Sequence, residues 1–334
     1  MKKITALIMA LAVIFAALAM SSCGKDYSGL NVRVYALKGP TGMGISKLME
    51  DSENGKAALD YDFELVSAPA ELTAEILGGR FEIAAVPVNL AATLYNKGAD
   101  ISLVAVNTLG VLYIKENGSA INSVSDLAGK TVYATGKGAT PEYILRYLIE
   151  KSGIAYESVS IEWLSDGSEV ASRYIADISS GKYSVAMLPE PSLSSENARE
   201  KQITSADVSQ SRVALDLTAE WDKVSDTELV QGVIIASNKF IAENPGALEK
   251  FLGEYGKSVQ FVNENPDEAG KLIEKFGIVA NAIVAATAIP NCNICLYTSK
   301  RMKDMTRDMF SVLFELNPQS VGGKIPDDAF YYEK

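Results

Sequence analysis

Two short apolar runs, 102 residues apart, share one pattern of residue types. Residues 79–87 read Gly-Arg-Phe-Glu-Ile-Ala-Ala-Val-Pro, and residues 181–189 read Gly-Lys-Tyr-Ser-Val-Ala-Met-Leu-Pro. Each run predicts a turn, a short buried strand and a proline that ends the strand. A helical pattern precedes each of them, at 70–77 and at 169–178. The sequence therefore predicts the same local plan twice.

The repetition extends upstream in both halves. A strand at 34–36 runs into the Gly-rich turn 38–42, and a strand at 132–134 runs into the turn 136–141. Helices are expected to follow at 43–50 and at 141–151, the second with Thr140 as N-cap and Pro141 at the first helical position. Alternating strands and helices predict an α/β fold with two lobes, each a mostly parallel sheet flanked by helices. Ligands of such sheets bind at the carboxyl ends of the strands, so we expect a ligand cleft between the lobes.

The remaining strands and helices predict how the lobes connect. Strand patterns at 101–108 and 109–115 place a first crossing near 107–110, and those at 212–217 and 229–236 place the return between 213 and 231. Asn244-Pro245 and Asn265-Pro266 open helices that we expect on the first lobe. Met302, Met305, Met309 and Leu313 share a helix face, which indicates core packing more than a partner surface. The expected division is a leader at 1–22, a tether at 23–29, a first lobe at 30–108 and 229–334, and a second lobe at 109–228.

The N-terminal residues have the pattern of a secretory leader. Lys2 and Lys3 precede seventeen residues, 4–20, of which all but Thr5 are apolar. This stretch is short for a membrane span, and small residues follow it. The segment before Cys23 resembles a bacterial lipobox, with Met20 in place of the usual leucine. We therefore expect Cys23 to be lipidated and to anchor the protein outside the cytoplasm, although a simple leader followed by an incidental cysteine is the alternative.

Charge and composition exclude several classes of function. The net charge is −11, or −13 without Lys2 and Lys3, and no cluster of basic residues interrupts the acidity. A nucleic-acid partner needs a basic surface, so none is expected. The chain has no histidine, which removes the commonest general base and zinc ligand. We expect no catalytic residues, no metal site and no cofactor, and an anionic ligand would need a strong local site.

Cys292 and Cys295 form a C-x-x-C pattern. It is typical of a redox pair or of half a metal site. Zinc would need two further ligands, and the chain has no histidine and no second such motif. The motif follows the turn-like residues 289–291, whereas redox motifs usually open a helix. A structural pair is favoured, and an extracytoplasmic redox or enzymatic protein using these thiols is the alternative function.

Candidate ligand contacts lie where the paired strands end. Gly-rich turns between a strand and a helix let backbone N–H groups approach a ligand. Asn89 would cap its helix or contact the ligand, Glu190 would meet a cationic or hydroxyl group or be solvated at the rim, and Asn107 and Thr108 would touch the ligand or satisfy the crossing backbone. The candidates are Lys38, Gly39, Pro40, Thr41, Gly42, Met43, Asn89, Asn107, Thr108, Lys137, Gly138, Ala139, Thr140 and Glu190.

Several of these motifs together resemble one family. They are the segment before Cys23, the turn 39–44, the run 81–87, the Ser-Asp-Leu-Ala-Gly-Lys run 125–130 and Asn244-Pro245. Over about residues 30–330 the chain is similar to solute-binding proteins of ABC importers, in the group that includes alkanesulfonate, nitrate and thiamine-precursor binders. The resemblance implies a type II periplasmic-binding-protein fold, a monomer that closes on a small molecule, and delivery to a permease with its ATPase. Relatives include an enzyme that consumes its own histidine, an activity that this histidine-free chain does not inherit.

Overall fold

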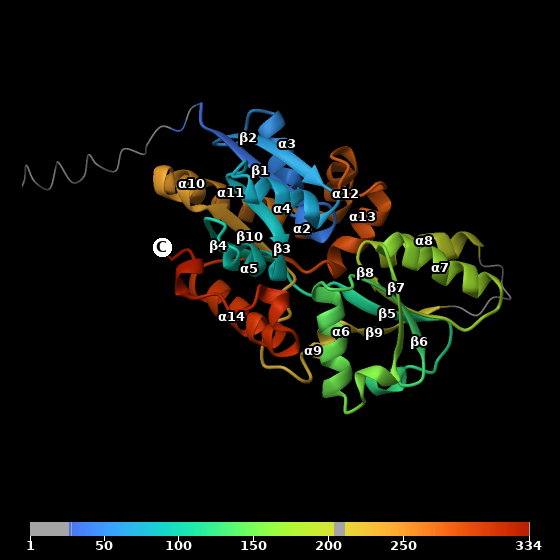
Figure 1. Ribbon diagram of the computed structural model, residues 1–334. Coiled ribbons are helices and arrows are strands. Elements are labelled where there is room, and N and C mark those ends of the chain that lie inside the picture. The colour runs from blue at the N-terminus through green and yellow to red at the C-terminus, as the bar shows by residue number, and fades with distance from the viewer. Residues whose placement is uncertain (1–26, 28, 204–210, 334) are drawn as a thin grey trace, which may run out of the picture.

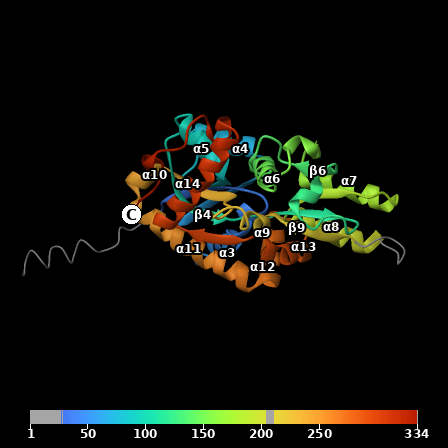
Figure 2. The same cartoon turned by 90° about the horizontal axis from the view of Figure 1, so that it is seen from below.

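The computed structural model describes residues 27, 29–203 and 211–333. Figure 1 shows two lobes, each built around its own sheet, and the view from below shows them side by side in an elongated molecule (Figure 2). The predicted signal segment and Cys23 lie outside the described residues. No helix in the described ranges is long and apolar enough to cross a membrane.

The first sheet has six strands within the described residues, in the order β11-β4-β10-β3-β1-β2. β2, β1, β3 and β4 run one way, while β10 and β11 run against them. The strands are β1 (Asn31–Leu37), β2 (Asp60–Val66), β3 (Ile83–Pro87), β4 (Ile101–Thr108), β10 (Gly232–Ser237) and β11 (Ile294–Tyr297). The expected mostly parallel sheet is therefore a mixed sheet, because the strand that returns from the second lobe enters it from the opposite end.

Helices cover both faces of the first sheet (Figure 1). One face carries α4 (Pro69–Leu77), α5 (Val88–Asn96) and α14 (Ser299–Leu316). The other carries α3, α11 and α12, which pack on one another. The helices of the second face are α3 (Ser46–Glu53), α11 (Pro245–Glu264) and α12 (Pro266–Lys275). The other helices of this lobe are α2 (Pro40–Met43), α10 (Asn238–Glu243), α13 (Ala282–Ala288) and the 3-10 turns η3 (Ile289–Asn291), η4 (Pro318–Val321) and η5 (Asp328–Phe330).

The second sheet has five strands among the described residues, in the order β7-β6-β8-β5-β9, and only β5 runs against the others. α7 and α8 cover one face and α6 and α9 the other (Figure 1). The elements are β5 (Leu112–Glu116), η1 (Val124–Leu127), β6 (Thr131–Thr135), α6 (Thr140–Lys151), η2 (Tyr156–Ser158), β7 (Ser160–Leu164), α7 (Gly167–Ser179), β8 (Val185–Pro189), α8 (Ser192–Ile203), β9 (Arg212–Asp216) and α9 (Leu217–Trp221).

The predicted repetition is present in the fold. β3 and β8 are five-residue strands at the same offset of 102, and each occupies the third place in a parallel run, β2-β1-β3 and β7-β6-β8. Their central residues are buried, as a strand between helix layers requires. The predicted strands 34–36, 101–108 and 132–134 and the helices 70–77 and 169–178 are confirmed.

Four local predictions are wrong at their boundaries. The helix expected at 43–50 is broken at Gly44-Ile45 into α2 and α3, because the Gly-rich turn forms a helical turn of its own. The strand expected at 109–115 begins only at Leu112, since residues 109–111 form the crossing. The strand expected at 229–236 is β10, which begins at Gly232. The predicted strand 212–217 ends at Asp216, whose side chain caps α9 through the N–H of Thr218.

The core confirms the reading of the methionine stripe. Met302, Met305, Met309 and Leu313 are buried where α14 packs on β4 and α5. The same hydrophobic cluster continues through Leu217 and Trp221 to α6 and the second sheet. The lobes therefore share apolar packing on the side where α14 meets α6.

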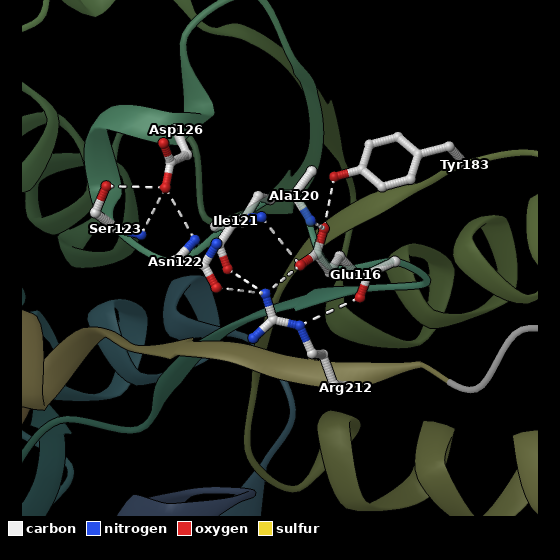
Figure 3. Close-up of polar contacts among 9 residues, drawn as sticks. Glu116, Ala120, Ile121, Asn122, Ser123, Asp126, Tyr183 and Arg212 are labelled. Atoms are coloured by element: carbon white, nitrogen blue, oxygen red, sulfur yellow. Dashed lines mark hydrogen bonds and ion pairs between the residues drawn. The ribbon is translucent and has the colours of Figure 1, made fainter.

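Strand β5 carries two neighbouring buried charges that point to opposite faces of the second sheet. Lys115 is 1% exposed and binds Glu196, Asn197 and Glu200, with Nζ to Glu200 Oε2 at 2.6 Å. Glu116 accepts from the N–H groups of Ala120 and Ile121, from the Tyr183 hydroxyl and from Arg212 (Figure 3). These contacts join β5 to α8, to β9 and to the loop after β5 that contains Ala120 and Ile121.

Candidate functional site

A cavity of about 500 Å³ lies between the two sheets, and loops from both lobes line it. It stands at the carboxyl ends of β1, β3, β6 and β8, where an α/β sheet of this kind binds its ligands. The two runs that repeat at an offset of 102 thus end at one space. We call this space the interlobe cavity.

The first-lobe turn supplies four of the predicted contacts, Lys38, Gly39, Pro40 and Thr41. Gly39 has a φ of 97°, which a side chain would strain, and it lets the chain turn from β1 directly into α2. Gly42 and Met43 do not line the cavity. A Cβ on Gly42 would lie 2.7 Å from the Leu37 carbonyl oxygen, and Met43 is fully buried in the core, so both residues serve packing.

The second-lobe turn contributes Gly138, Ala139 and Thr140, whereas Lys137 is exposed and does not line the cavity. Thr140 is not the N-cap of α6. That position is Ala139, and the Thr140 hydroxyl instead donates to Asn89 Oδ1 of the first lobe at 3.0 Å. Asn89 likewise caps no helix, because α5 begins one residue before it. Both side chains line the cavity and bridge it from one lobe to the other.

Glu190 lines the cavity but is not solvated at its rim. It is 2% exposed, and its carboxylate accepts from the Ser194 N–H at 3.1 Å, from the Ser194 hydroxyl at 2.9 Å and from Asn291 Nδ2 at 3.2 Å. Burial raises the pKa of the Glu190 carboxyl, and these hydrogen bonds oppose that shift. Both oxygens are therefore engaged by the protein itself.

The two residues at the end of β4 have different surroundings. Thr108 lines the cavity, and its hydroxyl donates to Asn107 Oδ1 at 3.3 Å. Asn107 is fully buried outside the cavity, where its amide donates to the Thr41 carbonyl oxygen at 3.0 Å and to the Tyr255 hydroxyl at 3.3 Å. Asn107 thus holds the first-lobe turn in place from behind.

Sequence reasoning missed about half of the lining. Gln231 lines the cavity, and its side-chain Nε2 is buried without a hydrogen-bond partner among the described residues. Its backbone joins two strand ends of the first lobe, those of β4 and β3, since Gln231 N donates to the Thr108 carbonyl oxygen at 3.0 Å and Val88 N donates to the Gln231 carbonyl oxygen at 2.9 Å. The repeated prolines were a usable signal, because six of them line the cavity: Pro40, Pro69, Pro87, Pro141, Pro189 and Pro191.

Helix N-termini surround the interlobe cavity. Residues at the start of α4, α5, α6 and α8 line it, and each such terminus places the positive end of a helix dipole at the cavity. Among the described lining residues, the charged side chains are Lys38 and Glu190, and none is aromatic. The Glu142 carboxylate, in the first turn of α6, binds the Gly138 N–H and lies outside the lining.

Cys292 and Cys295 lie away from the cavity lining and are free thiols. Cys292 is fully buried, and burial raises its pKa well above the usual value. Burial also raises the pKa of Cys295 to about 12. Reactive cysteines have low pKa values, so the raised pKa values of Cys292 and Cys295 do not support the redox alternative.

The fold is shared with solved structures of binding proteins. An ABC transporter protein from Parabacteroides distasonis matches with a TM-score of 0.73 and 23% identity, over 91% of this chain and 99% of that one. The periplasmic aliphatic sulphonate binding protein of Escherichia coli matches with a TM-score of 0.67 and 16% identity, over 89% and 94%. The desulfurization enzyme DSZB also matches, with a TM-score of 0.60 and 12% identity over 91% and 96%. The predicted two-lobed periplasmic-binding-protein fold is confirmed, and binding proteins and an enzyme both use it.

Sequence comparison places the chain in a family. No curated protein matches it. The family model described as NMT1/THI5 like matches residues 67–269, more than half of the chain, and that range covers β3, the elements of the second lobe from β5 to α9, and α11. The chain therefore belongs to the NMT1/THI5-like family.

Proposed function

We propose that this protein is the extracytoplasmic solute-binding component of an ABC importer. The observation that carries the proposal is the interlobe cavity, which draws its lining from corresponding strand ends of two lobes. Its volume of about 500 Å³ suits a small organic molecule. The family and the fold neighbours support the same role, and the permease and ATPase of the importer would be the partners.

We propose further that the ligand is a small aliphatic anion. A protein with a net charge of −11 repels anions, so an anionic ligand needs a locally positive site. Four helix N-termini and Lys38 contribute positive potential to the cavity. Six prolines supply an apolar wall, while an aromatic wall for a flat heterocycle is lacking among the described lining residues. Both oxygens of Glu190 already accept from Ser194 and Asn291, and burial raises the pKa of this carboxyl, which makes it a weak counter-charge for an amine.

We propose that the protein binds its ligand without altering it. The chain has no histidine, and the lining hydroxyls of Thr108 and Thr140 donate to asparagine oxygens and not to a general base. The lipid anchor at Cys23 and the expected lobe bounds belong to the same proposal. Because β1 begins at Asn31, such an anchor would hold the first lobe nearest the membrane.

Thermal unfolding with matched ligands tests the proposal. We expect ethanesulfonate or propionate to raise the melting temperature, because a ligand at 100 times its Kd stabilises the folded state by about 2.7 kcal/mol. Ethanol, ethylamine and a pyrimidine serve as matched neutral, cationic and heterocyclic probes. Lys38→Met should weaken the protection by the anions, and Lys137→Met, outside the lining, is the control.

The outcomes separate the parts of the proposal. Protection by the amine or the pyrimidine in place of the anions would overturn the anionic ligand and keep solute capture. Absence of protection by all of these classes, at millimolar concentration, would argue against a small-solute site in this cavity.

A further inference from the structure

The segment that contains Cys292 makes hydrogen bonds to the second lobe, although the chain does not cross between the lobes there. It belongs to the first lobe, since β11 pairs with β4 and the Asn263 amide donates to the Ile294 carbonyl oxygen at 2.8 Å. The residues just before β11, Asn291 and Asn293, nevertheless place their hydrogen bonds on the second lobe and on the first crossing. The cysteine motif thus marks a contact point between lobes.

Asn293 holds the crossing itself. Its carbonyl oxygen accepts from Leu109 N at 3.1 Å, and its Nδ2 donates to the Gly110 carbonyl oxygen at 2.6 Å. Its φ of 45° lies in the left-handed region, which asparagine tolerates better than most residues. Gly110 in turn packs against Thr218 and Leu229 of the returning chain, where a Cβ would meet the Thr218 Oγ1 at 2.1 Å. Asn293 therefore sits where both connections pass.

Asn291 makes its bonds beyond the crossing, on the second sheet. Its carbonyl oxygen accepts from the Tyr113 hydroxyl of β5 at 3.0 Å, and its Nδ2 donates to Glu190 Oε1, at the end of β8, at 3.2 Å. Tyr113 and Glu190 are both buried, while Asn291 is exposed. One first-lobe residue thus makes hydrogen bonds to two neighbouring strands of the second lobe.

We propose that Asn291 is a latch between the lobes and that Asn293 is part of the pivot about which they turn. This inference rests on the proposed function, because it describes how the ligand cleft opens. A rotation about residues 109–111 keeps the bonds of Asn293, which lie at the crossing, and separates Asn291 from Tyr113 and Glu190. Asn291 is a positioning residue: it acts on the ligand only through the placement of the second lobe.

The contacts that remain after release make such a latch reversible. Glu190 keeps the N–H and hydroxyl of Ser194, so its buried carboxylate stays hydrogen-bonded when Asn291 departs. Asn291 is exposed, so water replaces its lost partners. Other bonds between lobes, from Thr140 to Asn89 and from the Asn317 amide to the Tyr143 hydroxyl, involve α6 and the segments that face it. The latch acts where α13 meets α8.

Distances between spin labels on the two lobes test the latch without any ligand. Lys271→Cys on α12 and Ser179→Cys on α7 are exposed and lie on either side of the α13–α8 contact. Pulsed electron paramagnetic resonance on the protein expressed from the full chain gives the distribution of lobe separations. A sample without the two engineered cysteines measures labelling of the native thiols, of which Cys292 is buried and Cys295 is partly exposed.

We expect Asn291→Ala, which removes the amide bond to Glu190 and keeps the backbone carbonyl that accepts from Tyr113, to shift the distribution toward longer distances, with a closed-to-open ratio that falls roughly fivefold. Tyr113→Phe removes the other hydrogen bond of the latch and should shift the distribution in the same direction by a similar amount. Asn263→Ala loosens the same segment inside the first lobe and should leave the distribution unchanged. Unchanged distances in both Asn291→Ala and Tyr113→Phe would overturn the latch, and because no ligand is present this outcome leaves the proposed solute capture untouched.

Discussion

Replacement of Lys115 tests how the second lobe is held together. Its ammonium group is 1% exposed and binds Glu196 and Glu200, whose side chains are 0% and 10% exposed. Lys115→Met keeps much of the apolar stem and leaves two carboxylates in the interior without their cation. Removal of one partner from a buried ion pair costs about 3–5 kcal/mol, a large share of the 5–15 kcal/mol that typically stabilises a domain. We therefore expect a loss of that size at pH 7.

The pH dependence of this loss has a definite sign. Burial already raises the pKa of the Glu196 carboxyl, with Lys115 opposing the shift, and removal of the lysine raises it further. A carboxyl whose pKa is higher in the folded state than in the unfolded state binds protons more tightly when the protein is folded. The Lys115→Met variant should therefore gain stability as the pH falls toward the ordinary pKa of glutamate. The deficit of Lys115→Met relative to wild type should thus shrink between pH 7 and pH 5.

Urea unfolding followed by tryptophan fluorescence measures both effects. The chain has two tryptophans, Trp163 in β7 and Trp221 in α9, and both lie in the second lobe. Lys182→Met is the matched control, because the Lys182 side chain is 69% exposed and its pair with Asp177 is 3.9 Å long; such a pair contributes about 0–1 kcal/mol. A deficit of Lys115→Met below about 1 kcal/mol, or one that is equal at pH 7 and pH 5, would refute the reasoning.

Three further predictions concern the cysteines. Cys292 and Cys295 should react slowly with a thiol reagent in the native protein and fast in urea, because burial raises both pKa values. Fast labelling of the native protein would support the redox alternative. Replacement of both cysteines by serine should leave the thermal protection by ligand intact. Cys23→Ser should release the protein from membranes into the soluble fraction on cell fractionation, whereas continued co-sedimentation with membranes would contradict the lipid anchor.

The parts of the fold that the sequence predicts well are those set by local pattern. β3 and β8 are recognisable because a buried strand between helix layers needs a continuous apolar run, and a proline ends each run. The antiparallel course of β10 and β5 has no such local signal. It follows from the crossings, which bring each strand into its sheet from the other lobe.

The candidate site shows the same limit at the level of side chains. Lys38 to Thr41 and Gly138 to Thr140 were placed at the cavity because strand-to-helix turns must lie at strand ends. The prediction of Thr140 as a helix cap is wrong because its partner, Asn89, is 51 residues away in the other lobe. The prediction that Glu190 meets a ligand group or solvent lacks its contact with Asn291, because no local pattern pairs residues 101 positions apart.

The polar contacts differ in strength within the lobes and between them, and the difference bears on how the cleft works. Inside the second lobe, the buried side chains of Lys115 and Glu116 fix β5 through charged contacts, and the fully buried pair of Lys115 with Glu196 is the costly one to break. Between the lobes, the bonds from Thr140 to Asn89 and from Asn317 to Tyr143 join neutral groups, each contributing about 1 kcal/mol. A ligand shifts the equilibrium between two lobe arrangements by the difference between its affinities for them, and a tenfold difference, about 1.4 kcal/mol, already exceeds one such bond. Ligand binding can therefore move the lobes relative to each other while each lobe stays intact.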